Sequence, residues 1–309
     1  MNHKFMITTL LALVALTGQA QTTKTATITG DSLTLAQIHS RVNPVHVLQV
    51  GEQAVDAELF DMQGNTHHLT ELLGKSGQYV LLDFWDIGCG PCRMAEPEMS
   101  EVYGRVKGKL EIIGINKDRL SMWQENGFSK SLAWINWNDG KQGKGGVESR
   151  YCDINAVPYY VMISPDGRIL WKAAGYIPGL FLGMADALDG PQQDNSLNLR
   201  LVVRQVDANA EGTKVGFRYY GKKGDWFRMA KDAYLTADGK RYKMTAADGI
   251  KLDVDNYPDV NAFSFRYVGD VNYCDFTLTF EPFDTKPATF DFKESDDQGA
   301  FVVRNISLE

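Results

Sequence analysis

Two cysteines of this chain stand three positions apart, where an apolar run meets a helical pattern. Residues 83–92 read DFWDIGCGPC, so Cys89 and Cys92 come shortly after the apolar run at 79–85, which only Asp83 interrupts. A thiol in the first turn of a helix lies near unpaired N–H groups and the positive end of the helix dipole, which favours its thiolate. A second thiol one turn later can attack the first sulfur and release what it captured. The spacing therefore predicts thiol–disulfide exchange.

Other uses of a Cys-x-x-Cys pair fit this sequence less well. A structural zinc site needs a second pair of close ligands, but Cys152 and Cys274 stand alone and all five histidines precede the motif. A c-type haem needs histidine directly after the second cysteine, where Arg93 stands. Zinc remains the disfavoured alternative. We expect Cys152 and Cys274 to be buried apolar residues, with a disulfide between them as the alternative.

The first residues have the pattern of an export signal. Residues 1–20 combine Lys4, an apolar stretch and small residues before Gln21, which predicts a cleaved signal peptide and a periplasmic protein. An uncleaved anchor is the alternative, but the stretch is short for a membrane span. The net charge of −7, without basic clusters, excludes a nucleic-acid-binding role. Residues 21–46 are expected to be an N-terminal extension with a strand at 25–29.

Residues 47–190 alternate between strand and helix patterns. We predict buried strands at 79–85 and 110–115, helices at 93–106, 120–124 and 181–188, and a hairpin of strands 159–164 and 168–173. Pro97 falls inside the first helix and should kink it. This order of elements indicates an α/β domain with a mixed central sheet flanked by helices.

The pattern changes after a linker-like segment at 190–196. Residues 191–309 contain alternating runs and Asp-Gly turns at 238–239 and 248–249, without a comparable helix, so we predict an antiparallel β-sandwich or barrel. The strands are expected at 197–206, 215–220, 241–245, 263–268, 276–280, 289–292 and 301–306.

A family resemblance rests on the motif and its surroundings. Phe84-Trp85 followed by Cys89-Gly90-Pro91-Cys92 resembles a thioredoxin-fold active site, and the wider pattern resembles the exported TlpA/ResA-like thiol–disulfide oxidoreductases. The other matching segments are Val50-Gly51, Ala54-Val55-Asp56, residues 61–65 with Leu69, Arg93, Glu96-Pro97 and Ala156-Val157-Pro158. The resemblance covers residues 47–188 and implies a thioredoxin-like domain.

The resemblance also implies catalytic roles. Cys89 would be the exposed attacking thiol and Cys92 the more buried resolving thiol, held in helical geometry by Pro91. Asp83 interrupts an apolar strand, so burial should raise its pKa and make it a proton acceptor for Cys92. A purely structural carboxylate is the alternative for Asp83. Pro158 is expected to be cis and to face the sulfurs, the alternative being an ordinary proline at the start of a strand.

The resemblance further implies a substrate site. Trp85, Gly90, Pro91 and Val157 are its expected residues, with the Val157 backbone pairing with an extended substrate segment. Three positions depart from the family pattern: Gly88 replaces a tryptophan, Tyr159 replaces a threonine, and Asp86 adds a negative charge near the motif. The loss of the tryptophan at Gly88 is expected to open the site or change the surface that meets its partner. Asp86 works against a thiolate at Cys89 unless Arg93 offsets it.

The leading hypothesis is a periplasmic thiol–disulfide oxidoreductase that reduces protein disulfides. Its cofactor is its own dithiol, its substrates are disulfide-bearing exported proteins, and its reductant is a membrane thiol electron donor. One alternative is a peroxidase on the same fold, although the chain lacks the Pro-Thr-rich loop around a lone cysteine. Another is a docking protein that acts through the β domain, with aromatic residues at 217–220 or 226–227 on its surface.

Overall fold

The computed structural model describes residues 26–28, 31–33, 45–74, 77–141, 146–194, 200–259, 261–265 and 269–308. The predicted signal peptide at 1–20 lies outside these residues. Contacts divide the chain into the units Met1–His46 and Val47–Glu309. In the first unit, β1 (Ala26–Ile28) pairs with β2 (Asp31–Leu33), within the strand predicted at 25–29. The predicted domain boundaries, including one at 190/191, stay predictions.

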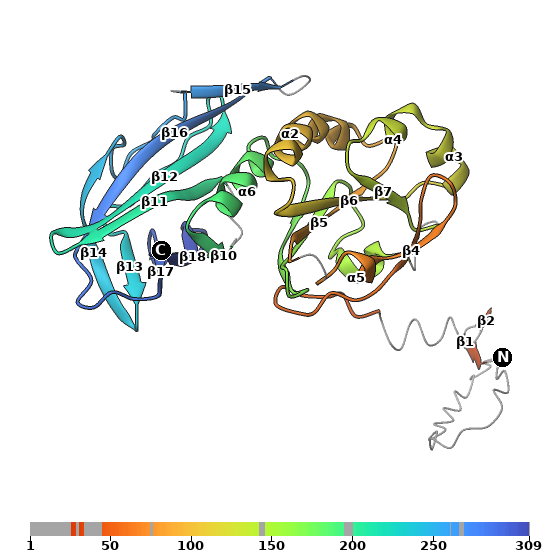
Figure 1. Cartoon of the computed structure of the whole chain (residues 1–309), viewed down its shortest axis with the longest axis horizontal. Coiled ribbons are helices and arrows are strands. Elements are labelled where there is room, and N and C mark those ends of the chain that lie inside the picture. The colour runs from red at the N-terminus through yellow and green to blue at the C-terminus, as the bar shows by residue number, and fades with distance from the viewer. Residues whose placement is uncertain are drawn as a thin grey trace, which may run out of the picture. The chain divides into compact units, whose positions relative to one another are not determined.

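A mixed sheet forms the centre of the thioredoxin-like domain (Figure 1). Among the described residues its strand order is β4-β3-β7-β6-β5-β8-β9, with β5, β6 and β7 parallel and the other pairs antiparallel. Its strands are β3 (Glu58–Phe60), β4 (Thr66–His68), β5 (Tyr79–Trp85), β6 (Leu110–Asn116), β7 (Ile135–Asn138), β8 (Tyr159–Ile163) and β9 (Ile169–Ala174). Its helices are α2 (Gly90–Val106), α3 (Leu120–Glu125), α4 (Gly127–Ser131), α5 (Glu148–Tyr151) and α6 (Leu180–Asp189), with the 3-10 turn η1 (Leu69–Glu71).

The central strand β5 is buried on both faces. Leu81 packs in the core that α2 and α6 cover, whereas Leu82 and Phe84 pack in the core on the opposite face with Tyr151. Side chains alternate along a strand, so Asp83 and Trp85 point to the same face as Leu81. The predicted apolar strand therefore sends every second side chain toward the helix that begins at the cysteines.

The buried carboxylate of Glu98 ties α2 to α6. It accepts hydrogen bonds from the Tyr176 hydroxyl at 2.6 Å and from the backbone N–H groups of Gly179, Phe181 and Leu182 at 2.8–3.0 Å. These are N–H groups of the first turn of α6, which have no partners within the helix. Burial raises the pKa of Glu98, while the four donors favour its charged form.

Removing the Glu98 carboxylate should destabilise the domain. Glu98→Ala leaves the buried donors of α6 and Tyr176 without an acceptor, so we expect the free energy of unfolding to fall by roughly 3 kcal/mol. Urea unfolding measures this loss. Glu101→Ala, an exposed glutamate of the same helix, is the control and should change it by no more than about 0.5 kcal/mol. Equal effects of the two variants would contradict the role given to Glu98.

The second domain is an antiparallel sheet that curls into a nearly closed barrel. In the described part of the chain, its strand order is β10-β18-β17-β13-β14-β16-β12-β11, with β15 added to β16, and β11 comes back near β18. The strands are β10 (Gln192–Asp194), β11 (Leu201–Asn209), β12 (Gly212–Lys222), β13 (Tyr234–Ala237), β14 (Lys240–Asp248), β15 (Asn261–Phe265), β16 (Gly269–Phe280), β17 (Thr289–Lys293) and β18 (Val302–Ser307). An aromatic core fills its interior.

In the β domain one predicted turn is confirmed, and the predicted linker and most of the predicted docking surface are wrong. Asp238 and Gly239 both have positive φ, at 49° and 78°, and form the two-residue turn between β13 and β14. The segment predicted as linker instead contains β10, which pairs with β18. Of the aromatic residues proposed for a docking surface, those at 217, 219, 220 and 227 are buried, and Trp226 is 55% exposed.

Helix α6 packs against both domains. Asp186, 1% exposed, accepts a hydrogen bond from Tyr220 of β12 at 2.6 Å and forms ion pairs with Arg204 of β11 at 2.6 Å and Arg105 of α2 at 2.9 Å. Leu180 and Phe181 of α6 share one apolar core with residues of β11, β12 and β16. Helix α6 therefore packs in the core of the thioredoxin-like domain and also against the strands of the β domain.

Candidate functional site

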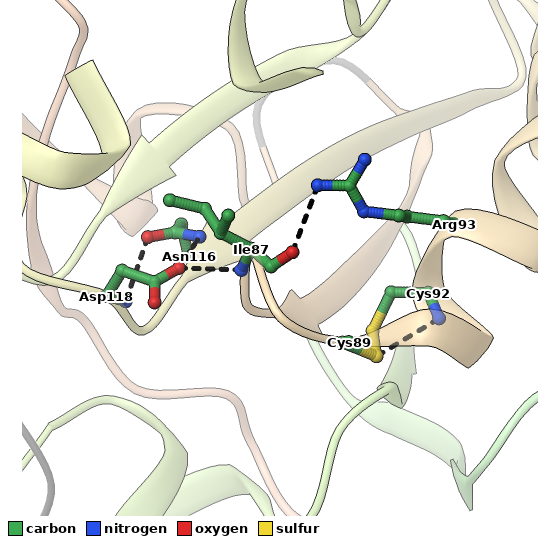
Figure 2. The surroundings of a disulfide bond; sticks show 6 residues. All are labelled: Ile87, Cys89, Cys92, Arg93, Asn116 and Asp118. Atoms are coloured by element: carbon green, nitrogen blue, oxygen red, sulfur yellow. Dashed lines mark hydrogen bonds between the residues drawn. A yellow bond between two sulfur atoms is a disulfide. The ribbon is translucent and has the colours of Figure 1, made fainter. Parts of the chain in front are cut away.

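The two cysteines of the motif form a disulfide at the start of α2. Cys89 is the N-cap of the helix, Gly90 is its first residue and Pro91 its second, so the helix begins three residues earlier than predicted. The Cys89 Sγ accepts a hydrogen bond from the backbone N–H of Cys92 at 3.0 Å (Figure 2). After reduction this N–H and the helix dipole would stabilise a thiolate at Cys89.

The predicted difference in exposure between the two sulfur-bearing residues is absent. Cys89 and Cys92 are each 7% exposed in the disulfide form, so the expectation of an exposed Cys89 above a more buried Cys92 is wrong for this state. Both pack in a small apolar cluster with the buried rings of Trp85 and Trp123, and Val157 lies against the same cluster. These neighbours leave little of either cysteine accessible to solvent.

Trp85 lies inside the protein and not on a substrate-facing surface. Its side chain is 1% exposed, and its indole N–H donates to the Asn136 side-chain oxygen at 3.1 Å. The ring therefore packs within the cluster around the disulfide. The prediction that Trp85 contacts the substrate is wrong. Gly90 and Pro91 are exposed beside the disulfide, as a substrate-contacting role requires.

Asp83 is the buried acid that the sequence predicted in β5. It is 5% exposed, and burial raises its pKa from 3.8 to about 7. It lies opposite Tyr160 of β8 and points to the α2 face, two residues before Trp85. A carboxyl group with this pKa holds and releases a proton near neutral pH, as a proton acceptor for Cys92 must.

A polar network supports the loop between β5 and α2. The Asp118 carboxylate accepts a hydrogen bond from the Ile87 backbone N–H at 2.7 Å and another from the Asn116 side chain at 2.9 Å (Figure 2). Arg93 donates to the Ile87 carbonyl at 3.1 Å, and Asn138 donates to the Asn116 side-chain oxygen at 2.9 Å. Asp118 thus holds the N–H of Ile87 and Arg93 holds its carbonyl, so the network fixes the backbone two residues before Cys89.

Sequence reasoning missed the members of this network outside the motif. Asn116, Asp118 and Asn138 lie at or just beyond the carboxyl ends of two parallel strands, β6, which pairs with β5, and β7, which pairs with β6. The carboxyl ends of parallel strands meet at one edge of a sheet, where functional sites of open α/β sheets form. The available signal was a pair of polar residues, Asn116 and Asp118, at the end of the apolar strand β6. Arg93 does not form an ion pair with Asp86 among the described residues; its guanidinium lies over the Phe128 ring instead.

The loop before β8 brings Val157 and Pro158 to the disulfide. The Val157–Pro158 peptide is cis, which confirms the predicted geometry. Pro158 is buried, and Val157 packs against the cluster that contains Cys89 and Cys92. Within the described residues, neither the N–H nor the C=O of Val157 makes a hydrogen bond, so both remain available to a bound chain.

The two other cysteines lie apart from this chemistry. Cys152 and Cys274 are free and buried, so the alternative of a disulfide between them is wrong and their prediction as buried residues is confirmed. Burial raises the pKa of both thiols, that of Cys274 to about 11. Neither is an activated nucleophile at neutral pH. Across the described ranges, no group of three or more His, Cys, Asp or Glu side chains is placed to hold a metal ion.

Comparison with known proteins agrees with this geometry. The model of the AhpC/TSA family matches residues 50–170. The thiol-disulfide oxidoreductase ResA of Bacillus cereus (strain ZK / E33L) is 34% identical over 133 residues, which are 41% of this chain and 71% of that protein. The chain belongs to the ResA family of thiol-disulfide oxidoreductases. The residues that the AhpC/TSA model matches lie within the thioredoxin-like domain.

Other relatives match shorter shares of their own length. ResA of Halalkalibacterium halodurans is 42% identical over 69 residues, 22% of this chain and 38% of that protein. The probable nucleoredoxin 2 of Oryza sativa subsp. japonica is 27% identical over 161 residues, 50% of this chain and 37% of the rice protein. The chain therefore spans less than two fifths of these two relatives. A solved thiol:disulfide interchange protein from Bacteroides sp. is 27% identical with a TM-score of 0.39, covering 48% of this chain and 96% of that one.

Proposed function

We propose that this protein is a periplasmic thiol–disulfide oxidoreductase that reduces disulfides of exported proteins. The observation that carries the proposal is the Cys89–Cys92 disulfide at the N-terminus of α2, with the Cys89 sulfur hydrogen-bonded to the Cys92 N–H. In the reduced protein, the Cys89 thiolate attacks one sulfur of the substrate disulfide, and the other substrate sulfur leaves as a thiolate. The result is a mixed disulfide between Cys89 and the substrate.

Cys92 completes the reaction. Its thiol gives its proton to Asp83, and the resulting thiolate attacks the Cys89 sulfur. The Cys89–Cys92 disulfide forms again, and the second substrate sulfur leaves as a thiolate that takes up a proton. Two electrons pass from the dithiol to the substrate, so a thiol electron donor at the membrane must reduce the protein again.

Two further features support a polypeptide substrate outside the cytoplasm. The N–H and C=O of Val157 are available for pairing with an extended segment beside the disulfide. The pattern of residues 1–20 favours export from the cytoplasm, and proteins with disulfides occur mainly outside the cytoplasm. Among the described helices, none combines the length and the apolar composition that crossing a membrane requires.

The direction of the reaction is tested by the equilibrium of the purified protein with glutathione buffers. For a reductase we expect a reduction potential close to thioredoxin's, about −270 mV, together with reduction of insulin disulfides in the presence of dithiothreitol. A potential of about −120 mV would instead assign the protein to disulfide formation. Absence of insulin reduction by the wild-type protein would contradict the proposal itself.

The two alternatives from the sequence have separate tests. For a peroxidase on the same fold, the wild-type protein would have to consume hydrogen peroxide faster than the variant with Cys89 and Cys92 both replaced by serine. We expect equal rates. A docking role of the β domain would depend on Trp226, because the other aromatic residues considered for it are buried. Trp226→Ala should leave insulin reduction unchanged.

A further inference from the structure

The loop that carries Val157 is held by a buried lysine and a tyrosine. Lys172 of β9 has a side chain only 5% exposed, and its ammonium donates to the Asp153 carboxylate at 2.6 Å and to the Leu48 carbonyl at 2.9 Å. The Tyr159 hydroxyl donates to the other oxygen of the same carboxylate at 2.8 Å. Burying an ammonium group costs free energy unless the charge is paired. The ion pair with Lys172 therefore holds Asp153 at this position.

The same loop is fastened a second time, two residues later. Lys117 donates to the Asn155 side-chain oxygen at 2.7 Å, and the Lys117 backbone N–H donates to the carbonyl of Trp85 at 3.0 Å. The loop is therefore tied at Asp153 to β8 and β9, and at Asn155 to the strand end that leads to the disulfide. Between and beyond these ties, Ile154 is 52% exposed and the main chain of Val157 makes no hydrogen bond within the described residues.

Tyr159 is also one of the three positions at which this chain departs from the family pattern. It follows Pro158 directly and is 2% exposed, so its ring does not face a substrate. Its hydroxyl reaches back over the loop to Asp153, and the Asp153 backbone N–H donates to that hydroxyl at 3.3 Å. A threonine is too short to span this distance from the same backbone position. The larger residue thus adds a tie across the base of the loop.

We propose that Tyr159, Asp153 and Lys172 form a clamp that sets the position of the Val157 main chain and thereby determines affinity for extended polypeptide substrates. These are positioning residues: they act through the loop and do not touch the sulfurs. The inference depends on the proposed function, because it assigns a substrate class to the same site. It predicts that loosening the clamp weakens binding of polypeptides, whereas a small disulfide that needs no main-chain pairing reacts as before.

The test uses Tyr159→Phe in the full chain. Steady-state reduction of insulin should show a KM raised about fivefold, as expected for the loss of one hydrogen bond that orders the site, with kcat changed less than about twofold. The reduced variant should react with 5,5′-dithiobis(2-nitrobenzoate) at the wild-type rate. Tyr103→Phe is the matched control, because it removes a similar hydroxyl–carboxylate bond, to Glu111 at 3.0 Å, in the same domain.

A second pair of variants distinguishes an effect on the clamp from a general loss of folding. Asp153→Asn keeps one side-chain oxygen, which can still accept from one of the two donors, so it should raise the KM for insulin less than Asp153→Ala does. If Asp153→Ala does not fold, Tyr159→Phe and Asp153→Asn still decide the question. An unchanged KM for insulin in folded Tyr159→Phe would overturn the clamp, and so would an equal loss of reactivity toward both disulfides. Failure of the wild-type protein to reduce insulin would instead remove the proposed function itself.

Discussion

Replacing Cys89 with serine is expected to lower insulin reduction by about three orders of magnitude or more. The hydroxyl of serine is not ionised at the start of a helix at neutral pH, so no nucleophile remains to attack the substrate. Turnover of insulin with dithiothreitol measures this loss. Cys152→Ala is the matched control, since it removes a thiol that is free, buried and outside the disulfide, and activity should stay within about twofold.

Cys92→Ser should fail at the following step and leave a visible product. Cys89 still attacks the substrate, but no second thiol remains to resolve the mixed disulfide. A covalent complex with the substrate should therefore accumulate on non-reducing gels and disappear with dithiothreitol. Full turnover by either serine variant would rule out the mechanism, because each sulfur has a different and necessary task in it.

Asp83→Asn is expected to slow the resolving step at pH 7 by roughly one to two orders of magnitude. The asparagine cannot accept the Cys92 proton, whereas the wild-type carboxyl, with a pKa raised by burial to about 7, is partly ionised at this pH. In the wild-type protein the rate of mixed-disulfide resolution should rise as pH increases through about 7, and this rise should be absent in Asp83→Asn. Stopped-flow kinetics of single turnovers measures it. Asp86→Asn, which changes an acid outside β5, should keep the rise.

The same substitution should change stability in a way that depends on pH. The folded protein holds a proton on Asp83 up to about pH 7, whereas the unfolded chain loses it near 3.8, so stability falls as pH rises between these values. Above pH 7 the wild-type protein keeps a charged carboxylate buried. Asp83→Asn should then raise the free energy of unfolding by up to about 4 kcal/mol, since each pKa unit corresponds to about 1.4 kcal/mol, and have little effect below pH 4. A stability difference independent of pH would contradict the buried, titrating acid.

The features predicted best from the sequence depend on short segments. The position of Cys89 at a helix start, the apolar strand around Asp83 and the Asp238-Gly239 turn each follow from neighbouring residues and their periodicity. The family resemblance supplied the cis bond before Pro158, for which local composition favours trans.

The features that were missed depend on contacts between distant segments. The hydrogen bond from Ile87 to Asp118 joins the loops that follow β5 and β6, and the clamp at Asp153 joins residues from β8 and β9. The burial of Trp85 is likewise set by Trp123, which comes from a helix far along the chain. β10 pairs with the last strand, β18, so nothing in its own polar sequence marked it as a strand. Tertiary partners decide such positions, and a single sequence does not display them.

The shared position of α6 has a consequence for dissecting the molecule. Asp186 contacts Arg105 in the first domain and Arg204, Arg218 and Tyr220 in the second. Cutting the chain after α6 would remove these three partners of a buried carboxylate and expose an apolar surface. Such a fragment would be prone to aggregate, and its inactivity would say nothing about catalysis. The contribution of the β domain is therefore better examined by single substitutions on its outer strands than by deletion. Deleting the β domain would also destabilise the thioredoxin-like domain.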